Sequence, residues 1–403
     1  MLIVLGVTGG IAAYKATAII RQLTEAGHSV QVVPTENALR FIGATTLEAL
    51  SHHAVDSDLY SDVADVKHVQ LGQNADLIIV APATASFLAR FASGIADDLL
   101  GNTLLATKAP VLVAPAMHTE MWQHASTVAN VATLRSRGIT VLDPAIGRLT
   151  GEDSGPGRLP EAEEIISAAL ELVRPQDLAG RTLLITAGGT QEAIDPVRFI
   201  GNKSSGKQGV AIARSAKARG ARVVLIGANF GENMGDLSTE FDEFVSVVSA
   251  AQMQSAVEAH LESADVLVMA AAVSDFRVAE VSETKIKRSE VGNDITLKLI
   301  ANPDILKSAT VRVANENLKT ITVGFAAETA GNQTALLRLA EIKLASKGCD
   351  ILVANDVSEG KVFGADTNSV IVVSKAGASD FVEGTKDRVA DRIIDFLATS
   401  LTR

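Results

Sequence analysis

Cysteine and excess positive charge are both scarce in this sequence. Only one of its 403 residues, Cys349, is a cysteine, which excludes a disulfide framework and a zinc site built from cysteines and fits a reducing compartment. The formal net charge is -11, which argues against a nucleic-acid-binding surface. Any anionic ligand must therefore be met by local lysine and arginine side chains.

Targeting segments and the best-known nucleotide-binding motifs are also missing. The first residues lack the basic region and cleavage site of a signal peptide, and no apolar run reaches about 18 residues. We therefore expect a cytoplasmic protein with no membrane partner. Neither a Gly-x-Gly-x-x-Gly fingerprint nor a Walker loop occurs, which disfavours an unrelated nucleotide-dependent oxidoreductase.

The first half of the sequence reads as an open parallel α/β sheet. Residues 2–34 form a right-handed β-α-β unit with a glycine-containing turn at 7–10. The turn has too few glycines for a dinucleotide, so a mononucleotide such as FMN fits better, with Thr8 and Gly9 at its phosphate and Thr35 within reach. Further strands are predicted at 77–81, 111–114 and 140–142.

Polar loops follow the carboxyl ends of these strands, where α/β sheets bind ligands. A lone histidine in such a loop is more often a surface or core residue than a catalyst. His118 and His124 flank Glu120 but share no helical face, which argues against a metal site. The glycine-rich residues 147–159 are the best candidate for a mobile flap, and a plain linker is the alternative.

The α/β pattern starts again after a helix at 161–172 and a linker at 174–178. We therefore predict two Rossmann-like three-layer α/β domains, residues 1–178 and 179–403. The second domain has strands predicted at 182–187, 222–226, 245–247, 266–270, 320–324 and 350–354, a hairpin over 370–382 and a closing helix at 387–397.

The loop at 195–209 separates the first strand of the second half from a helix. It is rich in Gly, Ser, Lys and Arg, and loops of this kind hold phosphate because their amides and the following helix N-terminus point at the anion. A solvated surface loop is the alternative. The loop has apolar residues of its own around Arg198 and Asn202, so we expect it to be held in place.

Charged residues follow several other strand and helix ends in this half. Asp275 comes after an apolar strand and could hold Mg²⁺ against a nucleotide. Helix capping is a sufficient structural reason for Asp304, and lysines near a helix end commonly complement the helix dipole. In an acidic protein, however, the cationic groups at these ends favour a triphosphate site: Arg198, Lys285, Lys287, Lys343 and Lys347.

Motifs in both halves occur in a highly specific order. Residues 6–15, 81–85 and 93–100 are similar to the FMN-binding cysteine decarboxylases. The ligase-like motifs lie at 195–200, 204–207, 271–276, 285–287 and 324–329. Over nearly its whole length, the chain thus resembles the bacterial bifunctional phosphopantothenoylcysteine decarboxylase and phosphopantothenate–cysteine ligase of coenzyme A biosynthesis.

The resemblance implies that the first domain, a flavoprotein fold, decarboxylates 4'-phosphopantothenoylcysteine to 4'-phosphopantetheine with FMN. FMN would take two electrons from the substrate and return them after CO₂ is lost. His68 matches the catalytic histidine of the family. The residues implied in FMN binding are Thr8, Gly9, Gly10, Thr35, Ala83 and Thr84.

For the second domain, the resemblance implies that 4'-phosphopantothenate attacks CTP to give an acyl-cytidylate, from which cysteine displaces CMP. Lys285 would stabilise the developing charge, Asn202 would handle the acyl-cytidylate, and Asp275 would bind the ribose or Mg²⁺. The other implied CTP or substrate contacts are Arg198, Asn302, Pro303, Asp304, Ile305, Phe325, Lys343 and Lys347.

The sequence departs from the family pattern at two places in the decarboxylase. His118 stands where the family has an asparagine that grips the substrate carboxylate, and a histidine can still hydrogen-bond there. The flap has no cysteine to reprotonate the intermediate. The proton would then come from Asp153, Glu152, His118 or water, or the decarboxylase is impaired. We favour a working enzyme because His68 and the flavin motifs are retained.

An oligomeric state is implied by the resemblance alone. Relatives bind FMN at contacts between decarboxylase subunits and pair their ligase halves, so we expect a homo-oligomer, a dodecamer being one such assembly. The main alternative function is a non-catalytic FMN-binding regulatory protein of the same fold. The presence of His68 and of a complete ligase half argues against it.

We expect His68→Asn to abolish CO₂ release and to spare the ligase reaction. Lys285→Gln should do the reverse, because its charge is expected to act only on the acyl-cytidylate step. Both effects are measured as CO₂ and CMP release from purified protein. If either change stopped both reactions in a still-folded chain, the division into two sites would be wrong.

Overall fold

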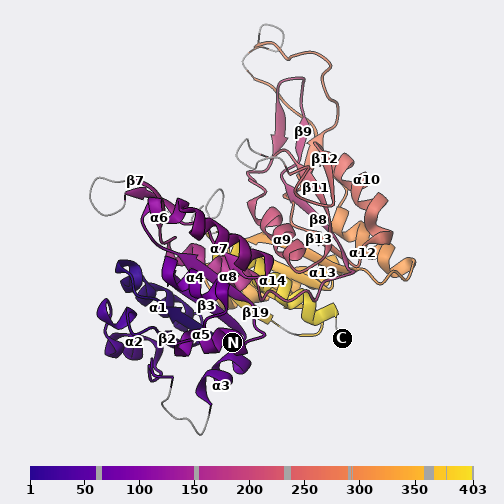
Figure 1. Cartoon of the computed structure of the whole chain (residues 1–403). Helices are drawn as coiled ribbons and strands as arrows, with labels where there is room; N and C mark the ends of the chain where they lie inside the picture. The colour runs from indigo at the N-terminus through magenta and orange to yellow at the C-terminus, as the bar shows by residue number, and fades with distance from the viewer. Residues whose placement is uncertain are drawn as a thin grey trace. The chain divides into compact units, whose positions relative to one another are not determined.

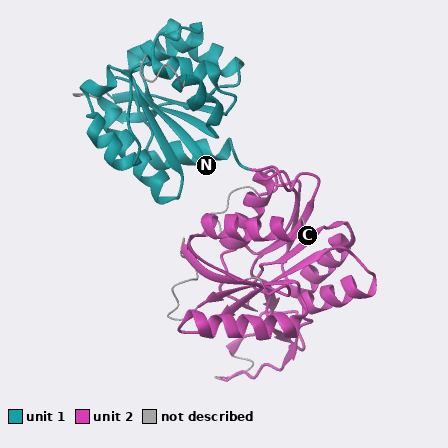
Figure 2. Ribbon diagram, turned by 90° about the horizontal axis from the view of Figure 1, so that it is seen from below, with its two compact units in different colours: residues 1–174 teal, residues 175–403 magenta. Residues whose placement is uncertain are grey.

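The computed structural model describes residues 1–59, 66–148, 154–230, 237–288, 292, 294–357, 367–377 and 379–401 (Figure 1). Two compact units, Met1–Arg174 and Pro175–Arg403, each have their own sheet and their own hydrophobic cores (Figure 2). The predicted α/β class, with helices on both faces of a sheet, is confirmed. Over the described residues, no helix combines the length and apolarity needed to cross a bilayer.

The first unit is built on a five-stranded, all-parallel sheet in the order β2-β1-β3-β4-β5. Its strands are β1 (Leu2–Val7), β2 (Ser29–Pro34), β3 (Leu77–Ala83), β4 (Val111–Pro115) and β5 (Thr140–Val141). Because successive side chains of a strand face opposite sides, Ile3 and Leu5 pack into one layer and Val4 packs into the other. The strands consist mostly of Val, Ile and Leu because both faces are covered.

In the described part of the first unit, helices cover both faces of this sheet. On one face lie α1 (Ala16–Glu25), α2 (Ala44–Ser51) and α8 (Ala162–Glu171), and on the other lie α4 (Ala85–Ser93), α5 (Leu99–Ala106) and α7 (Ala125–Ser136). The remaining elements used below are α3 (Lys67–Asn74), α6 (Thr119–Gln123) and the antiparallel pair β6 (Ala145–Arg148) and β7 (Ser154–Arg158).

The second unit contains an eight-stranded sheet in the order β12-β11-β8-β13-β16-β17-β18-β19. Its first six strands in this order are parallel, and the last two form an antiparallel hairpin at one edge. The strands are β8 (Thr182–Gly188), β11 (Arg222–Ala228), β12 (Glu243–Val247), β13 (Val266–Met269), β16 (Ile321–Glu328), β17 (Ile351–Asp356), β18 (Thr367–Ser374) and β19 (Ser379–Thr385).

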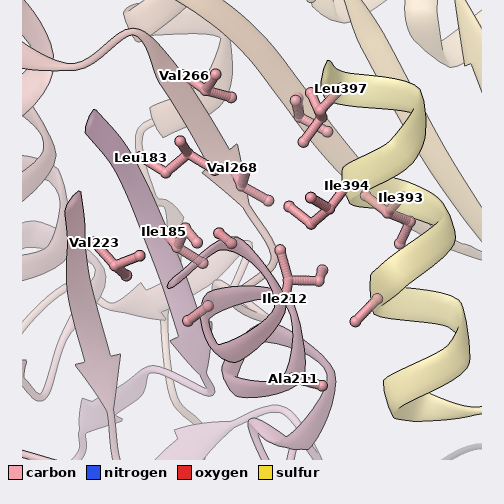
Figure 3. Packing of buried hydrophobic residues seen from close by; sticks show 14 of the residues in the cluster. Leu183, Ile185, Ala211, Ile212, Val223, Val266, Val268, Ile393, Ile394 and Leu397 are labelled. Carbon is pink, nitrogen blue, oxygen red and sulfur yellow. The ribbon is translucent and has the colours of Figure 1, made fainter. Parts of the chain in front are cut away.

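Helices again form a layer on each face of this sheet. One face is covered by α9 (Lys207–Ala218) and α14 (Lys386–Leu401), and the other by α10 (Ala250–His260), α12 (Ile305–Asn315) and α13 (Gln333–Lys347). Figure 3 shows Ile212 of α9 and Ile394 of α14 packing over Ile185 and Val268 of the central strands. Apolar side chains thus tie α14, at the end of the chain, to the first strands of the unit.

Three short antiparallel pairs were not predicted. One is β6 with β7 in the first unit, which lies in and beside the segment 147–159 predicted as a flap or a linker. The others, in the second unit, are β9 (Gln191–Ala193) with β10 (Phe199–Gly201), and β14 (Phe276–Val278) with β15 (Leu299–Ala301). Strands of three residues are too short to display a period, so the sequence pattern cannot reveal them.

The buried Arg219 forms hydrogen bonds with both the start of the second unit and its last helix. Only 7% of the Arg219 side chain is exposed, and its Nε donates to Asp177 at 2.8 Å while its Nη1 donates to Asp395 of α14 at 2.6 Å. The hydrogen bonds from Arg219 lower the pKa of the Asp177 carboxyl. In addition, the Leu178 N–H donates to the Arg219 carbonyl oxygen at 3.1 Å.

We expect Arg219→Ala to lower the free energy of unfolding by about 1–3 kcal/mol, because it removes charged hydrogen bonds from a largely buried guanidinium. Arg392→Ala is the matched control, since Arg392 also pairs with Asp395 but its side chain is 52% exposed; its effect should stay within about 0.5 kcal/mol. Urea denaturation measures both.

The Arg219→Ala effect should also depend on pH. Because the pKa of Asp177 is depressed in the folded chain, its contribution is present above the unfolded pKa and is lost as the pH falls. The difference between wild type and Arg219→Ala should therefore shrink below about pH 4. A difference that grew with acidification would contradict this role for the pair.

Candidate functional site

The loops after β1 and β3 are joined at the carboxyl edge of the first sheet. Thr8 donates from its N–H and its Oγ1 to the carbonyl oxygen of Pro82, at 3.2 and 2.8 Å. The same Oγ1 accepts a hydrogen bond from the Thr84 N–H at 3.0 Å. Thr84 in turn caps α4, because its side chain accepts from the Phe87 N–H.

The loop after β2 closes against this edge. The Thr35 N–H donates to the Val7 carbonyl oxygen at 2.9 Å. A Cβ on Gly9 would lie 2.5 Å from Cβ of Asn37, so only glycine allows this close approach. The structure therefore gathers all the residues predicted to bind FMN at one edge: Thr8, Gly9, Gly10, Thr35, Ala83 and Thr84. Hydroxyls, close-packed glycine backbone and the start of α4 suit the phosphate of a mononucleotide.

A cavity of about 280 Å³ opens beside these loops. It is bounded by residues that follow β1 and β4 and by β6 and β7, and it includes the cationic side chains of Lys15, Arg148 and Arg158. Glu161 holds two of them, since its carboxylate lies 3.1 Å from Lys15 Nζ and 3.2 Å from an Arg158 nitrogen. Such a wall suits a substrate with a carboxylate or phosphate group.

None of these three cations was predicted as a site residue, although a signal existed. Lys15 closes the motif at 6–15, and Arg158 ends the Gly-Pro-Gly-Arg stretch of the predicted flap. Their positions in those motifs could have identified both.

The predicted catalytic residues of the first unit do not all lie at the cavity. His118 is exposed, precedes α6 at its N-cap position without a side-chain capping hydrogen bond, and lines the cavity. His68 is partly buried in the first turn of α3, a helix that packs against α5, and is not among the residues that line the cavity. Asp153, like Glu152, falls outside the described residues.

The second unit has a cavity of about 430 Å³ at the carboxyl ends of β13 and β16. This cavity brings together most of the residues predicted to bind CTP or substrate, although they are scattered along the sequence: Asn202, Asp275, Asn302, Pro303, Asp304, Ile305, Phe325, Lys343 and Lys347. Arg198 and Lys285 were also predicted to bind CTP or substrate, but neither residue lines this cavity.

Hydrogen bonds from one asparagine fix the loop at the entrance to α12. The Asn302 N–H donates to the Asp275 carbonyl oxygen, and its Nδ2 donates to the Ser274 carbonyl oxygen, both at 2.8 Å. Its Oδ1 accepts from Arg277 at 2.9 Å. Asn202 reaches the same strand end, because its Nδ2 donates to the Val273 carbonyl oxygen at 3.0 Å.

The two lysines of this cavity have acidic partners. Lys347 Nζ lies 2.6 Å from Asp304, and Lys343 Nζ lies 2.5 Å from Glu328. Asp304 also caps α12 by accepting from the Lys307 N–H, so the capping role expected for it is confirmed. Either lysine can bind a nucleotide phosphate by exchanging its carboxylate partner for the phosphate.

Few protein groups in this cavity could serve as ligands of a metal ion. Among the described residues, no group of three or more His, Cys, Asp or Glu side chains is arranged to hold a metal. Asp275 is exposed at the cavity and offers one carboxylate. Mg²⁺ in nucleotide sites is commonly held by one or two carboxylates and by the substrate phosphates, so this donor set fits a nucleotide-bound Mg²⁺.

Arg198 and Lys285 are linked through a buried carboxylate. The Asp195 side chain is wholly shielded from solvent and accepts from the N–H groups of Val197 and Ile286, at 2.8 and 3.2 Å, and from the Arg198 guanidinium at 2.5 Å. Burial alone would raise the pKa of Asp195, but these hydrogen bonds lower it to about 2. Arg198 also donates to the Ile286 carbonyl oxygen at 3.0 Å. The pair therefore holds the segment that presents the exposed Lys285.

Another cavity, of about 440 Å³, lies at the opposite edge of the same sheet. It is formed near the starts of β16 and β17, and its charged residues pair with one another, Lys375 with Asp350 and Arg392 with Asp380. No predicted site residue lines it. The chemistry of the unit is thus concentrated at the carboxyl edge.

Comparisons with known proteins match both units. The family model described as "Flavoprotein" covers residues 1–174, and that described as "DNA/pantothenate metabolism flavoprotein C-terminal domain" covers 178–401. A Mycobacterium tuberculosis protein named "Coenzyme A biosynthesis bifunctional protein CoaBC" is 54% identical over 99% of this chain and 96% of its own length.

Two further matches carry the same name. The Vibrio vulnificus protein of that name is 39% identical, over 98% of this chain and 97% of its own. Among solved structures, the C-terminal domain of a CoaBC protein is 34% identical, with a TM-score of 0.45, and covers 56% of this chain and 98% of that one.

We expect Asp195→Asn to lower kcat of the ligase reaction predicted for this unit by about 10- to 100-fold, because small displacements of a catalytic group have effects of this size. KM for CTP, the predicted nucleotide substrate, should change less than about threefold, since Asp195 does not line the cavity of about 430 Å³. CO₂ release from supplied 4'-phosphopantothenoylcysteine should be unchanged.

Asp380→Asn is the matched control, because Asp380 pairs with Arg392 at the opposite edge of the sheet. An unchanged kcat for Asp195→Asn would show that Asp195 does not position the Lys285 segment.

Proposed function

Since this chain belongs to the CoaBC family of bifunctional coenzyme A biosynthesis proteins, we propose that each of its two units catalyses one of the two reactions at the carboxyl edge of its sheet. The protein is an enzyme of coenzyme A biosynthesis with ligase and decarboxylase activities. The second unit couples 4'-phosphopantothenate to cysteine with CTP and Mg²⁺, and the first decarboxylates the product with FMN.

The observation that carries the ligase assignment is the convergence of distant segments on one cavity. Residues at 202, 275, 302–305, 325, 343 and 347 line it together. The cavity offers apolar surface at Phe325 for the base, one carboxylate at Asp275 for the ribose or Mg²⁺, and two lysines for phosphate. Lys285, held by the Asp195 turn, would stabilise the charge that develops as the acid's carboxylate attacks the α-phosphorus and pyrophosphate leaves.

The decarboxylase assignment rests on the edge of the first sheet. Gly9, Gly10 and Thr84 would hold the FMN phosphate, and Thr8 would fix their loops through its hydrogen bonds to Pro82 and Thr84. FMN when bound supplies a two-electron oxidation and reduction of the substrate's cysteine moiety. Lys15 and Arg158 would bind an anionic end of the substrate, and His118 would hydrogen-bond its carboxylate.

The proton for the decarboxylated product needs a donor other than a thiol. Asp153, Glu152 and His118 stay candidates for it. His118 is supported by its place in the cavity wall, and it would donate from a ring nitrogen. The implied homo-oligomer, in which His68 would act beside FMN, also stays a prediction.

Product analysis of the purified protein tests this function. With 4'-phosphopantothenate, cysteine, CTP and Mg²⁺, we expect CMP release that requires the acid, the nucleotide and cysteine, followed by CO₂ release. With 4'-phosphopantothenoylcysteine alone, CO₂ should appear without CTP. The protein as purified or reconstituted should absorb near about 450 nm, as FMN does. Bound flavin without turnover in either reaction would favour the regulatory alternative and contradict the proposal.

A further inference from the structure

A carboxylate is buried at the root of the arm, the name used here for β9, β10 and the loop between them (191–201). Thr190 and Glu192 are two residues apart and both face inward: Thr190 is fully buried and Glu192 is only 4% exposed, whereas Ala193 is exposed. This alternation is that of an extended segment with one covered face. An acidic side chain is rarely buried so deeply without a partner, so the position of Glu192 requires a physical explanation.

The partner of Glu192 is the start of a helix. Glu192 Oε1 accepts a hydrogen bond at 2.8 Å from the N–H of Ala250, the first residue of α10. The N–H groups of a first helical turn lack intrahelical partners, and the helix dipole favours a negative charge there. Ser249 and Gln252 already form a capping box at this end of α10. Glu192 therefore satisfies an N–H group that the capping box does not, and it ties the arm to the helix.

The backbone next to Glu192 is anchored on two sides. The Gln191 N–H donates to the Val248 carbonyl oxygen at 2.9 Å, in the connection that leads into α10. On the other side, Thr190 Oγ1 accepts from the Ser274 N–H at 2.9 Å, in the loop that follows β13. The root of the arm is thus held between the start of α10 and the carboxyl end of the central strand β13.

The strand β10 carries this position on to Asn202. Glu192 lies directly opposite Ile200 in the antiparallel pair, two residues before Asn202. The end of β10 also packs closely on the root, because a Cβ on Gly201 would lie 2.8 Å from the Thr190 carbonyl oxygen. Asn202 lines the nucleotide cavity, whereas Glu192 and Thr190 do not. A shift of β9 would therefore displace Asn202, although Glu192 itself is separated from the cavity.

Resting on the proposed function, we propose that Glu192 is a positioning residue of the ligase reaction: its contact with the start of α10 sets the arm so that Asn202 reaches the acyl-cytidylate. Asp195, in the turn of the same arm, holds the Lys285 segment instead. The two buried carboxylates of the arm thus orient different groups. Glu192 acts through Asn202 and takes no part in making or breaking a bond.

Glu192→Ala should lower kcat of CMP release by about 10- to 100-fold, because small displacements of a catalytic group have effects of this size. KM for CTP should change less than about threefold, since Thr190 holds the loop after β13 independently of Glu192. Glu192→Gln keeps an oxygen that can accept from Ala250 and should retain most of the activity. In an Asn202→Ala background, Glu192→Ala should lower kcat by less than about a further threefold, because both changes act on the same group.

Ala250→Pro is a second way to break the contact. It removes the N–H donor, and proline is compatible with the first position of a helix. It should lower kcat as Glu192→Ala does, and it decides the question if Glu192→Ala does not fold. Ser249→Ala is the matched control, since it removes the cap of α10 but not the contact with the arm. It should lower stability in urea denaturation and leave kcat unchanged.

The outcomes distinguish this proposal from the proposed function. Wild-type protein that releases no CMP would refute the proposed function itself. If the wild type is active, an unchanged kcat in folded Glu192→Ala or Ala250→Pro would show that Glu192 does not position the arm. Fully additive losses from Glu192→Ala and Asn202→Ala, or an equal loss in Ser249→Ala, would show that Glu192 acts only on the stability of the unit.

Discussion

Burial of both faces of the parallel sheets is the constraint on which the rest of the structure depends. In β3 every residue is buried, and in β13 likewise, because helices cover each side. Polar side chains cannot be accommodated along such strands without partners, so polar chemistry is confined to the strand ends. Thr8 follows β1 and Asp275 follows β13 for this reason. The two units differ in sequence but obey the same constraint.

The carboxyl edges of the two sheets differ in their polar and charged contacts. At the first, Thr8 and Thr84 satisfy each other's hydrogen-bonding groups, and Gly9 lets the loop after β2 approach closely. At the second, Lys343 and Lys347 form ion pairs with carboxylates, which a phosphate of the proposed nucleotide substrate would replace.

Much of the fold is predictable from sequence because apolar runs mark buried strands. The carboxyl-edge rule then places Asn202, Asp275 and Phe325 near one another without knowledge of the sheet order. That order is not predictable, since pairing β13 between β8 and β16 depends on packing between distant segments. Arg198 was predicted as a cation for the ligand, but it contacts Asp195 and the Lys285 segment. The spacing of residues in the sequence does not reveal which of these groups an arginine will contact.

Hydrogen–deuterium exchange with each ligand tests the central claim, that each sheet binds its own ligand at its carboxyl edge. FMN should slow exchange of the amides at 8–15 and 82–84, and CTP with Mg²⁺ should slow those at 271–275, 302–306 and 325–328. Amides at 350–352 and 374–376, beside the cavity at the opposite edge, should be unaffected by CTP. Protection by CTP at that opposite edge, or by both ligands in the same unit, would contradict the account.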